Sequence, residues 1–114
     1  MENQAIHHIF RTTLEDAKAI DVVWLDVHNL TAVTDHMVIC TGRSNRHVKS
    51  IADRIMDAAK IHQHKAIGVE GYQQGEWVLV DLVEAIIHIM LPDKREFYDL
   101  ESLWFDPRLA ANQS

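Results

Sequence analysis

The chain has 114 residues, of which 47% are hydrophobic and 25% charged, and its formal net charge is −6. This length allows one domain with a real core but not two, and the composition is that of an ordinary soluble globular protein. No apolar run approaches the ~20 residues that cross a bilayer, and the start of the chain lacks the features of a signal peptide. We therefore expect a single cytoplasmic domain over residues 1–114, with a frayed polar tail at 107–114.

The negative charge is concentrated in the C-terminal part. Residues 1–69 carry 8 Lys/Arg and 8 Asp/Glu, whereas residues 70–114 carry 3 Lys/Arg and 9 Asp/Glu. Such a surface repels phosphates and attracts a basic protein surface, so we expect no sequence-specific nucleic acid and no membrane as partner. The alternative is that the acidity only keeps the protein soluble.

The first third of the chain predicts one helix followed by two strands. Helical spacing indicates an amphipathic helix over residues 3–20, formed by Ile6, Ile9, Phe10, Thr13, Leu14 and Ala17. Residues 21–27 predict a short strand. Residues 36–41 predict a second strand, which is apolar almost throughout and is therefore expected inside the sheet. This strand includes Cys40, the single cysteine, which is expected to be a small buried hydrophobe.

The middle of the chain predicts a second helix and a short strand. Gly42 supplies a tight turn, and Ser44 is a natural N-cap for a helix that ends near His62. The apolar stripe of this helix consists of Val48, Ile51, Ala52, Ile55 and Ala59. Residues 66–71 predict a third strand, and residues 72–75 a turn.

Two apolar runs, at residues 77–82 and 85–91, predict a β-hairpin, because their branched side chains suit a pleated surface. A turn at Leu82-Val83 would place Asp81 opposite Glu84, Leu79 opposite Ile86 and Trp77 opposite His88. One face is then wholly apolar and must be covered by helices. The other face is mixed and consists of Trp77, Leu79, Asp81, Glu84, Ile86, His88 and Met90.

The mixed face is too apolar to face plain solvent, so it predicts a docking surface. The alternative is a second core layer covered by the C-terminal segment. A one-residue slip in the hairpin would exchange the two faces. After the hairpin, Pro92 can open a last helical segment. The order of elements predicts an α/β (α+β) fold, with one mixed five-stranded sheet and helices mainly on one face.

The glycine turn before the second helix suggests two kinds of chemistry, and neither is complete. Arg43, Arg46 and Lys49 lie near the helix start and could hold a phosphate, but the repeated glycines of a phosphate-binding loop are absent, and a capped helix with a solvated basic edge is the favoured explanation. A nucleotidyltransferase needs paired carboxylates for magnesium on the next strand. Here a helix follows, and Asp53 and Asp57 lie on its exposed side.

No other catalytic or metal-binding set emerges. The histidines lack further ligands at the spacing of a zinc site, Ser44 is explained as a cap, and Cys40 as core. We therefore expect no metal, no cofactor and no enzymatic activity.

Three stretches resemble one family closely. They are ICTGRSNRHVKSIADRI at 39–55, GEWVLVDL at 75–82 and IHIMLPDKREFYDLESLW at 87–104. Together they are similar to the ribosomal silencing factor family (RsfS, iojap-like) from about residue 14 to residue 104. The resemblance implies a nucleotidyltransferase-like fold without the activity. It also implies a protein that binds the large ribosomal subunit through ribosomal protein L-fourteen, blocks joining of the small subunit and represses translation when nutrients are scarce.

Carried over by position, the family's partner surface falls on Trp77, Asp81, His88, Met90, Tyr98 and Asp99, and the mixed hairpin face adds Leu79 and Ile86. This chain departs from the family at Val83-Glu84, where the family usually has Gly-Asp, and in the loop at 72–74. An alternative function is a large-subunit assembly or adaptor module, and a less favoured one is a nucleotidyltransferase-related enzyme. Away from the ribosome, an exposed apolar face would also allow a homodimer.

Overall fold

The computed structural model describes residues 2–27, 34–62 and 66–98. Its elements are α1 (Glu2–Asp16), β1 (Ile20–Asp26), β2 (His36–Thr41), α2 (Asn45–Ile61), β3 (Gly68–Glu70), β4 (Trp77–Asp81), β5 (Ala85–Met90) and α3 (Pro92–Tyr98). The strands form one sheet in the order β1-β2-β5-β4-β3. The β2–β5 pair is parallel and the other neighbours are antiparallel. The predicted mixed five-stranded sheet is therefore confirmed, with β2 inside it.

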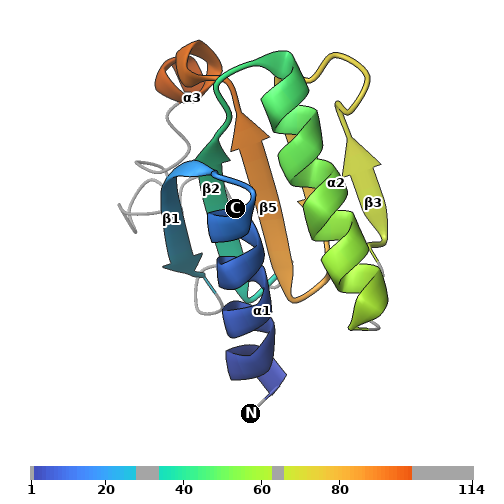
Figure 1. Cartoon of the computed structure of the whole chain (residues 1–114). Coiled ribbons are helices and arrows are strands. Elements are labelled where there is room, and N and C mark those ends of the chain that lie inside the picture. The colour runs from blue at the N-terminus through green and yellow to red at the C-terminus, as the bar shows by residue number, and fades with distance from the viewer. Residues whose placement is uncertain (1, 28–33, 63–65, 99–114) are drawn as a thin grey trace.

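Helices α1 and α2 lie side by side on one face of the sheet (Figure 1). The main core lies beneath them and includes Phe10 and Leu14 of α1, and Val80 and Ile87 of the hairpin. Helix α3 sits at one end of the sheet, where the Arg95 guanidinium donates to the Asp21 carbonyl at 2.6 Å and to the Thr41 hydroxyl at 3.0 Å. No helix within the described parts of the chain is long and apolar enough to span a membrane.

Helix α1 ends at Asp16, four residues before the predicted end. Lys18 adopts φ 63°, its N–H donates to Glu15 and the N–H of Ala19 donates to Leu14. These paired bonds form a Schellman motif, which normally carries glycine at the left-handed position. The prediction was wrong here because a lysine fills that position.

Helix α2 matches its prediction. The Ser44 side chain accepts a hydrogen bond from the His47 N–H at 3.1 Å, and His62 is the C-cap. The buried residues are the predicted stripe of Val48, Ile51, Ala52, Ile55 and Ala59.

The third strand, β3, is shorter than predicted and ends before Gly71. Gly71 has φ 80°, and a Cβ there would lie 2.1 Å from the Trp77 carbonyl oxygen. A glycine without a Cβ permits both this positive φ and the close approach to Trp77. The chain therefore turns at Gly71 and continues into β4, the first strand of the hairpin.

The hairpin pairs Trp77 with Met90, Leu79 with His88 and Asp81 with Ile86. The predicted register was therefore wrong by two residues, but a shift of two leaves every paired side chain on its predicted face. The turn is Val83-Glu84, one position later than predicted, so Glu84 lies in the turn and not opposite Asp81.

The turn itself explains this error. The Glu84 N–H donates to the Leu82 carbonyl at 2.9 Å, and Val83 has φ 74°. This geometry is a classic γ-turn, which is rare and strained. A β-branched residue is the least expected one at its centre.

Candidate partner-binding face

The sheet face turned away from α1 and α2, which we call the second face, consists of three rows of side chains that cross the strands. The first row is Glu70, Leu79, His88, Ile39 and Val23. The second row is Gly68, Asp81, Ile86, Met37 and Leu25. The third row is Trp77, Met90 and Thr41. All six predicted hairpin residues therefore share one face.

Exposure decreases along these rows from β3 towards β2. Trp77, Leu79 and Asp81 on β4 are partly exposed, and we call these three residues the β4 strip. On β5, by contrast, Ile86, His88 and Met90 are only 8%, 7% and 0% exposed. The β5 side chains, and Met37 and Ile39 of β2, are buried, as a second core layer would require. Most of the C-terminal segment that was expected to cover this layer lies outside the described residues. Only the β4 strip remains accessible among the six predicted hairpin residues.

Trp77 and His88 are joined across the hairpin. The indole N–H of Trp77 donates to Nδ1 of His88 at 2.9 Å, and the ring centroids are 5.8 Å apart at an interplanar angle of 44°. An indole N–H can only donate, so the neutral His88 ring carries its proton on Nε2. Burial lowers the pKa of His88 from 6.5 to about 4, because desolvation disfavours the charged ring. His88 is therefore neutral at physiological pH.

Asp81 has a structural role that the sequence did not reveal. Its Oδ1 accepts a hydrogen bond from the Val83 N–H at 2.9 Å. This Asx-type contact supports the strained turn. One carboxylate oxygen is thereby engaged within the hairpin.

The other two predicted site residues lie at the limit of the described structure. Tyr98 is the last residue of α3, and Asp99 lies outside the described residues, as does the predicted frayed tail at 107–114. Their part in the surface stays a prediction.

Sequence reasoning missed Glu70, Met37 and Ile39 on the second face. Glu70 pairs with Leu79, and Ile39 pairs with His88. Pairing between strands distant in sequence cannot be read from local periodicity. The alternation within β2 was nevertheless a usable signal, because Met37 and Ile39 must point to the same face.

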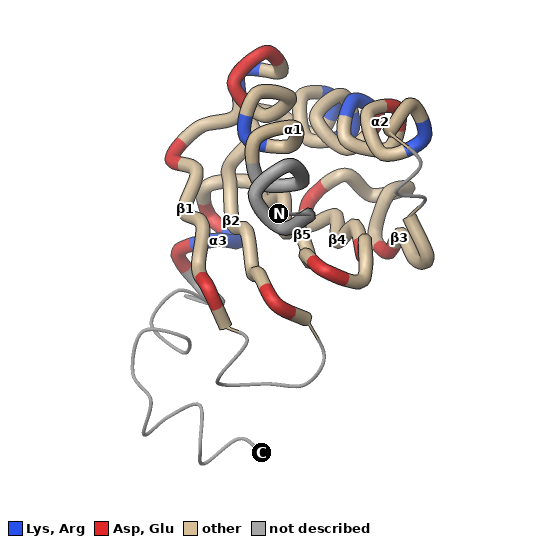
Figure 2. The backbone as a smooth tube through the Cα atoms, turned by 90° about the horizontal axis from the view of Figure 1, so that it is seen from below, with Lys and Arg blue, Asp and Glu red and all other residues tan. Residues whose placement is uncertain are grey.

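The accessible part of the face has a single sign of charge. Residues 66–93 contain five Asp/Glu and no Lys/Arg. Figure 2 accordingly shows no Lys or Arg along β3, β4 and β5, whereas Asp or Glu lies on β3, on β4 and in the turn between β4 and β5. An apolar strip in acidic surroundings suits a basic protein surface with an apolar centre.

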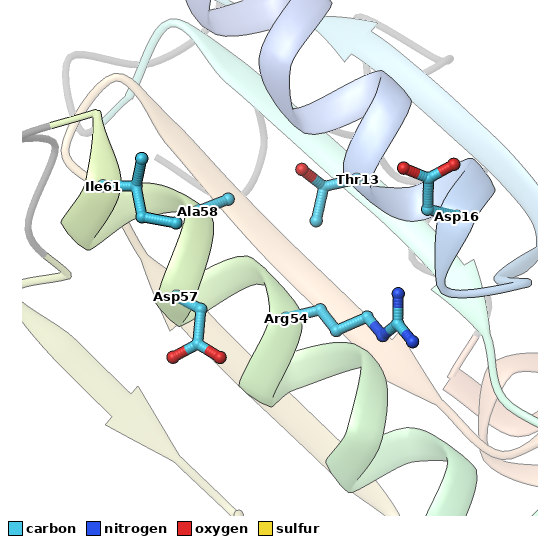
Figure 3. A pocket seen from close by; sticks show the side chains of 6 residues that line it. All are labelled: Thr13, Asp16, Arg54, Asp57, Ala58 and Ile61. Carbon is cyan, nitrogen blue, oxygen red and sulfur yellow. The ribbon is translucent and has the colours of Figure 1, made fainter.

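A second surface feature is an open groove of about 350 Å³ between α1 and α2 (Figure 3). It is lined by Thr13, Asp16, Arg54, Asp57, Ala58 and Ile61. Its charged side chains, Asp16, Arg54 and Asp57, are exposed to solvent.

The glycine turn at the start of α2 is a structural junction. The Arg43 N–H donates to Nδ1 of His47 at 2.9 Å, so Nε2 carries the proton and donates to the Ala17 carbonyl at 3.0 Å. His47 thus links the turn to the end of α1. Within the described ranges, no group of three or more His, Cys, Asp or Glu side chains could hold a metal ion.

Comparison with known proteins gives a consistent result. The family model described as "Ribosomal silencing factor during starvation" matches residues 1–114. The Ribosomal silencing factor RsfS of Haemophilus influenzae is 41% identical over 100 residues, which cover 88% of this chain and 98% of that protein.

A crystal structure of a Chromobacterium violaceum protein superposes with a TM-score of 0.88 at 41% identity, covering 91% of this chain and 87% of that one. The mouse protein named Mitochondrial assembly of ribosomal large subunit protein 1 is 33% identical over 107 residues, which cover 85% of this chain and 46% of that protein. The chain belongs to the ribosomal silencing factor (RsfS) family.

Proposed function

We propose that this protein binds the large ribosomal subunit through ribosomal protein L-fourteen and prevents the small subunit from joining. Translation would thereby be repressed in the cytoplasm when nutrients are scarce. Membership of the family supports a ribosomal silencing role, and the choice of L-fourteen follows from the family resemblance. The proposed contact surface is the β4 strip.

One observation carries the assignment of the surface. Trp77 and Leu79 are partly exposed apolar side chains on a stretch, residues 66–93, that has five Asp/Glu and no Lys/Arg. Ribosomal proteins are basic, so charge would guide the encounter while the apolar strip is desolvated on contact. Interface free energy concentrates in such central aromatic residues.

The proposed mechanism needs only steric exclusion. A body of 13.1 kDa bound at the subunit interface occupies space that the small subunit needs. No bond is made or broken, so the protein acts as a regulator and not as an enzyme. The relatives that carry the name ribosomal silencing factor are consistent with a regulatory role.

Sucrose-gradient analysis of purified subunits tests this proposal. The protein is added in excess to large subunits before small subunits and magnesium, and the fraction of joined ribosomes is measured. We expect that fraction to fall with the wild-type protein and to recover with Trp77→Asp. Ile61→Asp is the matched control, because Ile61 is 75% exposed on α2, away from the second face. An unchanged profile at saturating wild-type protein would contradict the proposal.

A second candidate is a role in large-subunit assembly through the same face. The name of the mouse relative favours it, since that name refers to assembly of the large subunit. Co-sedimentation with free large subunits fits both roles, so only the joining assay separates them. An assembly factor leaves the joining of mature subunits unchanged.

We also propose that the β4 strip can hold a second copy of the protein away from the ribosome, since exposed apolar surfaces tend to self-associate. Light scattering should then show dimers for the wild type and monomers for Trp77→Asp. If Trp77→Asp remains dimeric, the dimer uses another surface.

A further inference from the structure

We propose that His88 is a positioning residue for Trp77: it fixes the indole ring on the β4 strip and promotes partner binding through Trp77, without touching the partner. The inference rests on the proposed function, because it concerns the surface that would meet the ribosomal protein. It assigns to His88 a different role from that of a direct contact.

The geometry separates the two residues into an accessible and a buried one. Trp77 is partly exposed, whereas His88 is 7% exposed. His88 lies directly opposite Leu79, so Trp77 reaches it along the diagonal of the antiparallel pair. Diagonal neighbours are within reach of aromatic side chains, and here the indole N–H of Trp77 donates to Nδ1 of His88 at 2.9 Å.

A histidine at this position needs an explanation, because its neighbours in the row, Leu79 and Ile39, are apolar. A polar ring in an apolar layer destabilises the fold unless it is hydrogen-bonded. Among the described residues, the ring makes one hydrogen bond, and that bond goes to Trp77. The Nδ1 atom of His88 accepts that bond, and its role is therefore to hold the indole.

The bond should hold the indole before binding. Binding otherwise requires that a partly exposed aromatic side chain lose its rotational freedom, which weakens affinity. The neutral state of His88 keeps the Nδ1 lone pair available, since burial lowers the pKa of the ring to about 4. A pre-oriented indole should bind about five- to tenfold more tightly than a mobile one.

Four variants test this role by equilibrium binding to purified large ribosomal subunits. His88→Leu removes the acceptor and keeps an apolar side chain in the buried layer. His88→Asn places its carbonyl oxygen near the position of Nδ1 and serves as the rescue. Trp77→Phe removes the donor, and His88→Leu in the Trp77→Phe protein completes a double-mutant cycle.

We expect His88→Leu to weaken binding about five- to tenfold and His88→Asn to restore it to within about twofold. In the Trp77→Phe protein, His88→Leu should have no further effect. The indole N–H resonance of Trp77, assigned by its loss in Trp77→Phe, should shift in His88→Leu and stay near the wild-type position in His88→Asn.

Equal losses from His88→Leu with and without the indole N–H would overturn the inference, because His88 would then act independently of Trp77. So would unchanged binding in His88→Leu. Each of these results leaves the proposed function intact. Absence of wild-type binding to large subunits would instead refute the proposed function and this inference together.

Discussion

The strained turn at Val83 predicts an inverted order of stability between glycine and alanine. Val83 has φ 74°, a region that L-residues enter at a cost of about 1–2 kcal/mol and glycine enters freely. At an ordinary position, alanine is more stabilising than glycine by about 0.5–1 kcal/mol, because it restricts the unfolded chain. At Val83 the two effects together should give the glycine variant a free energy of unfolding about 1 kcal/mol higher than that of the alanine variant.

The two variants form a matched pair, because both remove a side chain that is 51% exposed. Thermal unfolding followed by circular dichroism should give Val83→Gly a melting temperature about 4 °C above that of Val83→Ala, as expected for a domain of this size. A more stable alanine variant would show that the turn is not left-handed in solution, and the hairpin geometry described above would then be wrong.

Three further predictions concern stability. Val80 is 0% exposed beneath the helices, so Val80→Asp would bury an unpaired carboxylate. This should lower the free energy of unfolding by several kcal/mol and abolish the far-ultraviolet circular dichroism signal of the fold. Ser44→Ala removes the cap of α2 and should lower the free energy of unfolding, measured in urea titrations, by about 1 kcal/mol. Ser44→Asp keeps a capping side chain and should leave that free energy near the wild-type value. The pKa of His88 is lowered to about 4 in the native protein. As the pH falls from 6.5 to 4, His88 is therefore protonated in the unfolded chain before it is protonated in the native protein. The free energy of unfolding should fall by up to ~3 kcal/mol over this range. Urea titrations across that range should show a smaller fall for His88→Leu than for the wild type; equal falls would contradict the assignment.

Much of the fold could be predicted from local patterns. Helix α2 was identified with its cap and its whole buried stripe, because the 3.6-residue period and Ser44 indicate the same start and the same face. The two hairpin faces were assigned correctly despite a wrong register. A hairpin error of two residues preserves the alternation that decides which side chains share a face.

The errors lie where backbone conformation contradicts residue preference. Lys18 and Val83 both adopt positive φ, which ends α1 early and shifts the hairpin turn. Neither residue type signals such a conformation, so the sequence offered no reason to expect it.

The candidate site was predicted only in part for a different reason. The shared face of Trp77, Leu79 and Asp81 follows from alternation along β4, but alternation does not show that β2 lies beside β5 and brings Ile39 next to His88 and Thr41 next to Met90. That pairing joins segments distant in the sequence. The division of the face into an accessible strip and a buried layer therefore required the three-dimensional structure.

The central claim, that the β4 strip binds the large ribosomal subunit, is tested most directly by the affinity of Trp77→Ala for purified large subunits. Binding is measured by co-sedimentation and corrected for the folded fraction, with Ile61→Ala as the control for loss of an exposed apolar side chain. Truncation of a central aromatic residue typically costs ~2 kcal/mol or more, which corresponds to a loss of about 30-fold or more. We predict that loss for Trp77→Ala and less than a twofold change for Ile61→Ala. Wild-type affinity in folded Trp77→Ala would contradict the claim.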